Sequence, residues 1–477
     1  MCGCVTTTTA AAPPTNRWKA LTVALVAGFM TLLDVSIVNV ALPSIRADLG
    51  LSAGGLQWVL SGYALTFGLL LVPAGRFGDA RGRRTVFIAG LAVFTLASAA
   101  AGLATSATWL IVARLVQGAA AGVVNPQVSG LIQQLFRPAE RARPFGLLGA
   151  TIGISTAVGP LLGGLLIQGF GAESGWRWIF FINIPIGAAA IVLGHKWIPA
   201  RRADQRERES LDPVGVVLLG LGVLLVLLPL VQEREWQGPA KWLLLVAGLA
   251  VLAGFLAWER RYAGHGTPLI ELSLFRVRSY GLGALIGLLY FAGFTTIFFI
   301  YTLYLQSGLR YSALLAGLAI TPFALGSAAA AALGGRIVNR YGRPLVAVGL
   351  ALVAAGLAGT VLALDLVPGA DGGWAAAVPL LVAGIGSGLV ISPNQTLTLA
   401  EVPVERAGSA GAVLQTGQRI GTAVGIAVVG AVFFNRLAAS AGDWSSALRT
   451  ALVVTIGLVL VALAAALADV LAARRTD

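Results

Sequence analysis

Long apolar runs, separated by short polar or charged stretches, make up most of this chain of 477 residues. Fourteen runs are long enough to cross a bilayer, because a helix of about 20 apolar residues spans its hydrocarbon core. We expect them at 20–42, 54–74, 84–104, 108–134, 144–168, 178–198, 211–231, 241–258, 280–304, 311–333, 344–364, 374–398, 408–433 and 448–471. The pattern predicts an all-α polytopic membrane protein with 14 transmembrane helices.

A short loop motif occurs twice and divides these helices into two sets. Residues 75–83 read GRFGDARGR after the second span, and residues 335–343 read GRIVNRYGR after the tenth. Glycine or arginine matches at the first, second, eighth and ninth places, which indicates two six-helix pseudo-repeat bundles plus two extra central helices. The expected division is a disordered tail at 1–19, a first bundle at 20–199, a linker with the extra helices at 200–279, a second bundle at 280–472 and a tail at 473–477.

Composition agrees with the membrane assignment and excludes other classes. Only 11% of residues are charged and the mean hydropathy is +0.86, whereas soluble domains carry about 25% charge. The net charge of +13 does not indicate a nucleic-acid partner, because the basic residues are scattered between apolar runs. Of the 33 basic residues, 24 fall on one side of the predicted membrane, seven on the other and two within spans. The positive-inside rule therefore places both termini in the cytoplasm.

Asp34 lies deep inside the first apolar run. The nearest flanking basic residues, Lys19 and Arg46, are roughly 22 Å and 18 Å away along a helix. A carboxylate at that depth is costly and needs a partner, a water-filled cavity or a proton. Asp34 is therefore the first candidate for a functional residue.

Arg114 is an embedded charge in the fourth span, about six residues from its outer end, in the string Arg114-Leu-Val-Gln117-Gly. Asp34 should lie at a comparable depth on its own helix, so the two charges can couple. Protonation of Asp34 would then release the arginine, and deprotonation would favour its return. The alternative is that Arg114 only ties helix ends together through backbone carbonyls.

Several strings together resemble the major facilitator superfamily, and its fourteen-span drug/proton antiporter branch in particular. They are the loop at 75–84, the R-x-x-Q-G string at 114–118, G-P-x-x-G-G at 159–164, the Trp-Arg-Trp string at 176–178 and LDVSIVNVALP at 33–43. The loop departs from the family pattern at Ala80, where a basic residue is usual. The resemblance implies a transporter whose conformational motifs comprise Gly75, Asp79, Gly82, Arg83, Gly159 and Pro160, with Asp79 as a latch on a neighbouring helix N-terminus or arginine.

Polar and aromatic residues within the spans are candidates for a substrate cavity. They are Asn39, Gln57, Trp58, Tyr63, Gln117, Asn394 and Gln415. Asn394 and Gln415 have an alternative interpretation as hydrogen-bonding contacts between helices, which is the more common role of embedded amides.

These observations predict a proton-coupled antiporter that exports lipophilic drugs or secondary metabolites by alternating access, with Asp34 as the coupling carboxylate. The expected partners are a lipophilic or cationic small molecule, protons and membrane lipid, with no nucleic acid; the protein should act as a monomer in a bacterial plasma membrane. The proton gradient replaces a cofactor, and no metal is expected. The alternatives are an exporter of an endogenous solute such as a sugar, amino acid or siderophore, or an integral-membrane enzyme or channel. The two histidines lie far apart, so no clustered metal or nucleophile site supports an enzyme.

Overall fold

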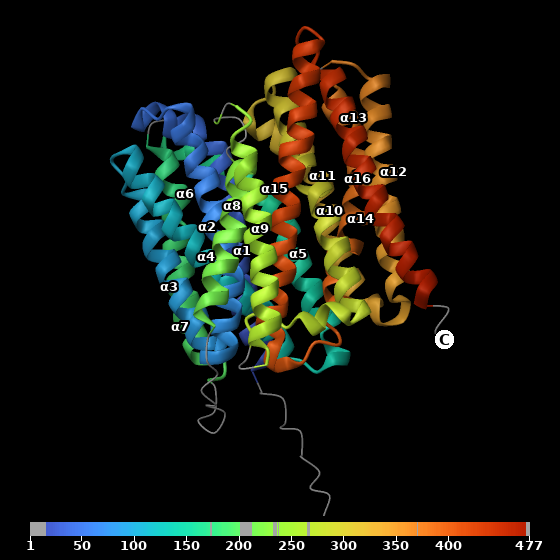
Figure 1. Ribbon diagram of the computed structural model, residues 1–477. Coiled ribbons are helices and arrows are strands. Elements are labelled where there is room, and N and C mark those ends of the chain that lie inside the picture. Colours follow the sequence, from blue (N-terminus) through green and yellow to red (C-terminus); the bar gives the residue numbers. More distant parts are fainter. Residues whose placement is uncertain are drawn as a thin grey trace, which may run out of the picture.

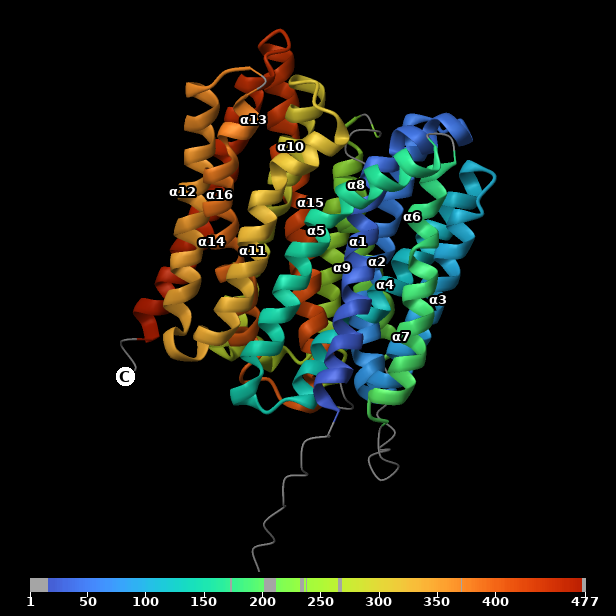
Figure 2. The same ribbon diagram turned by 180° about the vertical axis from the view of Figure 1, so that it is seen from behind.

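The computed structural model describes residues 16–171, 174–200, 212–231, 236, 238–264, 268–369 and 371–473. In this part of the chain, 14 helices are long and apolar enough to cross a membrane. The all-α fold class and the predicted number of spans are therefore confirmed. Helix α1 begins and α16 ends at the same end of the molecule. We call it the lower end, as it is oriented in Figures 1 and 2.

The first seven α-helices form one bundle (Figure 1). They are α1 (Arg17–Leu49), α2 (Ala53–Arg81), α3 (Arg83–Gly102), α4 (Ala107–Leu135), α5 (Ala142–Phe170), α6 (Trp178–Phe181) and α7 (Asn183–Trp197), with short helices η1 (Pro138–Glu140) and η2 (Gly175–Arg177) between them. Helix α1 starts at Arg17, so residues 17–19 are helical and do not belong to the tail that the sequence predicted. An ion pair of Arg17 with Glu140, 2.7 Å long, holds this first turn against η1.

The second bundle contains the last seven α-helices. They are α10 (Arg278–Leu303), α11 (Ala313–Tyr341), α12 (Arg343–Leu366), α13 (Gly372–Ala375), α14 (Ala377–Thr398), α15 (Ala407–Ala439) and α16 (Trp444–Ala473), with η4 (Leu272–Arg276), η5 (Tyr304–Gly308) and η6 (Val404–Arg406) as short connecting helices. The two extra helices are α8 (Pro213–Val231) and α9 (Lys241–Tyr262). Helix α8 packs on α9 and also contacts α2 and α15, so the extra pair covers one side of the junction between the bundles.

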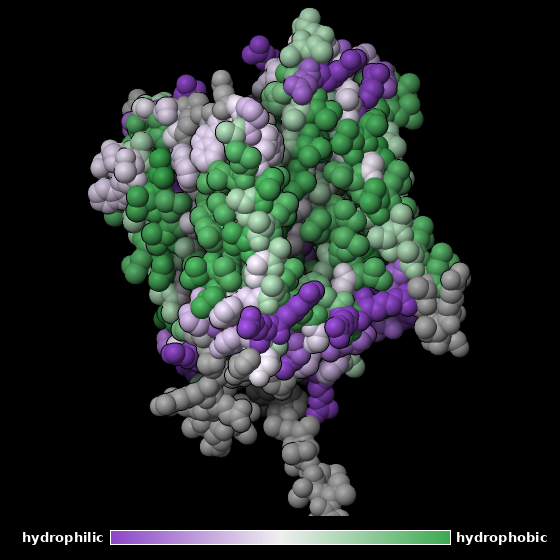
Figure 3. Space-filling model, in the orientation of Figure 1, coloured by the Kyte–Doolittle hydropathy of each residue, from purple (hydrophilic) through white to green (hydrophobic). Residues whose placement is uncertain are grey.

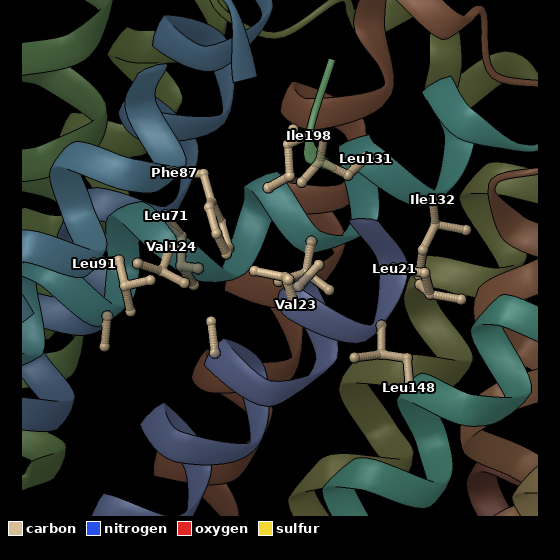
Figure 4. Packing of buried hydrophobic residues seen from close by; sticks show 14 of the residues in the cluster. Leu21, Val23, Leu71, Phe87, Leu91, Val124, Leu131, Ile132, Leu148 and Ile198 are labelled. Atoms are coloured by element: carbon tan, nitrogen blue, oxygen red, sulfur yellow. The ribbon is translucent and has the colours of Figure 1, made fainter. Parts of the chain in front are cut away.

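An apolar cluster lies at the centre of each bundle, and the first cluster extends into the second bundle through residues such as Tyr280 and Leu414. In the first, buried residues from α1 to α5 meet around Val23, Phe87 and Val124 (Figure 4). In the second, a comparable cluster includes Tyr290, Phe323 and Phe433. The outer surface in Figure 3 is apolar between polar residues at its upper and lower ends, as a bilayer requires. Burial inside each bundle and lipid contact outside it together account for the long apolar runs.

The repeated loop motif places a glycine with a positive φ between two helices in both bundles. Gly82, between α2 and α3, has φ +99°, and Gly342, between α11 and α12, has φ +59°. Residues with a side chain seldom adopt these angles, so the motif needs glycine at this place. The loop similarity therefore has a physical basis in the positive φ of this glycine, although ψ differs, at 120° for Gly82 and −140° for Gly342.

Candidate functional site

A sealed polar network surrounds Asp34 in the first bundle. Asp34 lies near the middle of α1, and its side chain is buried among α1, α3, α4 and α7. The Asp34 carboxylate forms an ion pair with Arg114 of α4, and both side chains are at most 1% exposed. The structure thus brings the two embedded charges of the first bundle into direct contact.

Neutral amides complete the network. The other Asp34 oxygen accepts hydrogen bonds from Gln117 at 2.8 Å and from Asn183 at 3.3 Å. The same two amides donate to the Ser98 hydroxyl at 2.9 Å and 2.8 Å. Three side chains from α4 and α7 therefore hold the carboxylate, Ser98 of α3 bonds two of them, and the charge is countered by a single cation.

Arg114 is anchored on more than the carboxylate. Its Nε donates to the backbone carbonyl of Val59 at 3.1 Å, and one terminal nitrogen donates to Gln117 at 2.7 Å. Its guanidinium carbon lies 4.3 Å from the centre of the Tyr63 ring. The two roles that the sequence left open for Arg114, coupling to an acid and tying helices through a carbonyl, are thus present together.

Close packing of α4 on α2 sets this geometry. A Cβ atom at Gly118 would lie 2.3 Å from the Tyr63 carbonyl oxygen, and one at Gly122 would lie 2.5 Å from the Phe67 carbonyl oxygen. Only glycine permits this approach, which follows the small-xxx-small pattern of membrane helices. The Thr66 hydroxyl adds a 2.8 Å hydrogen bond to the Leu115 carbonyl. The string after Arg114 therefore serves to bring the arginine against α2.

The loop motif at the lower end joins the two bundles. Asp79 accepts hydrogen bonds from the backbone N–H groups of Gly408 at 3.1 Å and Ser409 at 2.8 Å, in the first turn of α15. Arg83 pairs with Asp79 at 2.9 Å and donates to the Val404 carbonyl at 2.7 Å. Gly75 makes room for this contact, since a Cβ there would lie 2.7 Å from the Gly408 carbonyl oxygen.

The span-5 motif packs α5 tightly on α1. A Cβ atom at Gly159 would lie 1.9 Å from the Ser36 hydroxyl, and Ser36 donates to the Ser155 carbonyl at 3.0 Å. Pro160 sits inside α5, and its Cβ faces Gly317 of α11 in the other bundle. The motif thus lies where the two bundles approach each other.

The remaining cavity candidates do not gather in one site. Asn39 is exposed and donates a hydrogen bond to the Val35 carbonyl of its own helix. Trp58 packs against an apolar cluster that includes residues of α8 and α15. Asn394 donates a hydrogen bond to the Gly283 carbonyl at 2.8 Å. Gln415 bonds the Ser129 hydroxyl of the first bundle at 3.3 Å. The side chain of Gln57 lies outside the described residues. Asn394 and Gln415 thus make the helix contacts that were their alternative interpretation.

Two members of the Asp34 network were not predicted. Asn183 has a weak signal, because it is a lone amide in an apolar run two residues before Pro185. The chain is irregular at Ile182, between α6 and α7, as a following proline favours. Ser98 has no signal at all, since small hydroxyl residues are frequent in membrane helices.

Known proteins are similar to this chain over most of its length. A family model described as Major Facilitator Superfamily matches residues 24–426. A Streptomyces coelicolor protein named "Probable actinorhodin transporter" is 39% identical over 453 residues, covering 93% of this chain and 78% of that protein. The puromycin resistance protein of Streptomyces alboniger is 37% identical, with 90% of this chain and 84% of that protein covered. Among solved structures, the human organic anion transporter MFSD10 is similar in fold, with a TM-score of 0.66, 16% identity and coverage of 95% of this chain and 100% of that chain.

Proposed function

This chain belongs to the major facilitator superfamily and is a membrane transporter rather than an enzyme, and from that premise we propose that it exports antibiotics or similar lipophilic compounds in exchange for protons. The names of its relatives support the substrate class, because they include transport, resistance and export proteins for antibiotics. Proton exchange is our own inference and rests on the Asp34 network.

The observation that carries the proposal is the buried Asp34–Arg114 pair. Asp34 is held by one cation and two amides in a site closed to solvent. Protonation would remove its charge and leave Arg114 without a counter-ion, so the network would have to rearrange. A proton can thereby be linked to a movement of α4 against α1.

The contacts between the bundles support a conformational assignment. Every hydrogen bond that joins described residues of the two bundles lies in the lower half: Asp79 with Gly408 and Ser409, Arg83 with Val404, Asn339 with Ala139, and Ser129 with Gln395 and Gln415. If the lower end is cytoplasmic, as the basic residues indicate, the protein is in an outward-facing state. Asp34 would then take its proton from outside and give it up after the lower end opens.

The test is export from reconstituted vesicles under an imposed proton gradient, with puromycin as the first substrate. We expect Asp34→Asn to reduce gradient-driven export by at least about tenfold, because the amide cannot exchange a proton near neutral pH. Downhill movement of puromycin without a gradient should persist. Asp48→Asn is the matched control, since Asp48 is on the same helix but pairs with Arg177 at a partly exposed site. Undiminished gradient-driven export by Asp34→Asn would overturn the proposal.

A further inference from the structure

Arg419 is a second embedded arginine, and it belongs to the second bundle. It lies 12 residues into α15, roughly 18 Å from the lower end of that helix. Its guanidinium carbon is 4.2 Å from the centre of the Phe67 ring of α2, so the side chain reaches across the junction between the bundles. The Phe67 ring stacks on Tyr63, whose ring also contacts Arg114. Two aromatic rings thus separate Arg419 from the Asp34–Arg114 pair.

Within the described residues, Arg419 has no acidic partner, whereas three other largely buried arginines of the bundles do. Arg114 pairs with Asp34, Arg83 with Asp79, and Arg343 with Asp469. Among the described residues, Arg419 forms no hydrogen bond and no ion pair. Its guanidinium makes a cation–π contact with the Phe67 ring. An aromatic face offsets only part of the cost of a guanidinium at this depth.

The neighbouring turn of α15 also offers unused polar groups. The Thr416 hydroxyl is three residues before Arg419 on the same side of the helix, is 7% exposed and has no hydrogen-bond partner. Gln418 is partly exposed and likewise makes no hydrogen bond within the described structure. Arg419 itself is partly exposed. This part of the junction therefore presents a fixed positive charge and polar groups without a compensating carboxylate.

The charge balance of the mid-membrane region points to an anion. The charges of Asp34 and Arg114 cancel each other, which leaves Arg419 as one uncompensated positive charge. A planar guanidinium binds carboxylates through two parallel hydrogen bonds and retains its charge in any environment. We propose that Arg419 binds an acidic group of the transported compound, so that lipophilic anions carrying a carboxylate or phenolate belong to the substrate range. This inference rests on the proposed export function and adds anions to the cationic compounds that the sequence suggested.

Binding of two dyes of opposite charge tests the inference without relying on proton coupling. Fluorescein is an anion at neutral pH, and tetramethylrhodamine methyl ester is a permanent cation on the same three-ring scaffold. Affinities are measured by fluorescence anisotropy on the full-length protein in phosphatidylcholine nanodiscs, where no anionic lipid headgroup can occupy the site. The variants are Arg419→Gln, Arg419→Lys and, as a matched control on the same helix, Arg436→Gln, whose side chain bonds Ser446 at an exposed position.

We expect Arg419→Gln to weaken fluorescein binding by about 10- to 100-fold, the range for losing a charge-assisted hydrogen-bonded pair. Binding of the cationic dye should be unchanged or tighter, Arg419→Lys should retain part of the fluorescein affinity, and Arg436→Gln should resemble the wild type. Equal losses for both dyes, or fluorescein binding by the wild type no tighter than by Arg419→Gln, would overturn the inference. The first of these results would mean that Arg419 stabilises the contact between the bundles and does not bind the ligand.

The two proposals fail in different ways. If the charge-selective effect of Arg419→Gln is present but a proton gradient drives neither dye in vesicles, the anion site stands and proton-coupled export is wrong. If the gradient drives export and Arg419→Gln has no charge-selective effect, the export function stands and the anion site is wrong.

Discussion

Removing Arg114 should destabilise the protein far more than removing an arginine from an exposed ion pair. In Arg114→Gln, the Asp34 carboxylate stays buried with only the amides of Gln117 and Asn183 as donors. The substitution also removes the hydrogen bonds of Arg114 to the Val59 carbonyl and to Gln117. The variant is therefore left with an uncompensated charge in a site that is at most 1% exposed.

The expected cost follows from that burial. Breaking one side of a buried ion pair costs about 3–5 kcal/mol, because the remaining charge keeps its desolvation penalty. In Asp34→Asn/Arg114→Gln both charges are gone, and neutral amides can bond one another. The cost of the double variant should therefore be smaller than the sum of the single costs, with a coupling of at least about 2 kcal/mol. Arg449→Gln is the control, since Arg449 and its partner Asp365 are 54% and 39% exposed and such pairs contribute about 0–1 kcal/mol.

The assay is the free energy of unfolding, measured by titrating sodium dodecyl sulfate into protein in mild-detergent micelles and following tryptophan fluorescence. Arg114→Gln, Asp34→Asn, the double variant and Arg449→Gln are compared at neutral pH. A free energy for Arg114→Gln within about 1 kcal/mol of the wild type would refute the argument. So would simple additivity in the double variant, because it would mean that the two charges do not interact.

Two further predictions concern the lower latch and the helix packing. Asp79→Asn replaces two charge-assisted hydrogen bonds to α15 by neutral ones, so the lower end should open more often by roughly tenfold or more. Maleimide labelling of a cysteine introduced at the buried Ser392 measures this opening, in a background where Cys2 and Cys4 are replaced by serine. Unchanged labelling would contradict the prediction. Gly118→Ala places a Cβ 2.3 Å from the Tyr63 carbonyl oxygen and should lower the free energy of unfolding by about 1–3 kcal/mol. The control is Gly164→Ala, whose Cβ meets nothing within 4 Å, so that it should be neutral or slightly stabilising. Equal effects of the two alanines would refute the packing argument.

Much of the fold was predictable because the bilayer restricts the possible structures. A run such as 344–364 can only be a spanning helix, and α12 occupies Arg343–Leu366. The proximity of Asp34 and Arg114 was also predictable, since two opposite charges embedded in the apolar runs of one bundle have few other partners. These inferences used length, depth and charge, which the sequence states directly.

Contacts across helices were not predictable when they depended on rotation about the helix axis. Asp469 of α16 pairs with Arg343 at 3.0 Å and with Arg278 at 2.9 Å, yet no spacing in the sequence relates α16 to α12. Glu259 and Asp212 are both buried at the lower end of α8 and α9, although neither stood out among the charges of the linker. Both cases involve residues near helix ends, where a charge is ordinary in sequence and its partner is decided by packing.

The two copies of the repeated loop form inter-bundle hydrogen bonds of different strength from the same position in the motif. Asp79 and Asn339 occupy the same place in the two copies of the motif, and both reach across to the other bundle. Asp79 accepts two backbone N–H bonds at the start of α15, where the helix dipole favours a negative charge. Asn339 donates one 2.9 Å bond to the Ala139 carbonyl just before α5.

The two latches are therefore alike in position and unequal in energy, because a charge-assisted pair of bonds is stronger than a single neutral one. Arg343 pairs with Asp469 of its own bundle, so the second copy of the motif stabilises the packing of α12 on α16. It therefore adds little to the contact between the two bundles at the lower end. In the proposed transport cycle, closure of the lower end would thus depend mainly on the α2–α15 contact. The α5–α11 contact, packed through Gly146 and Gly335 with a single neutral hydrogen bond at its end, is suited to act as the pivot.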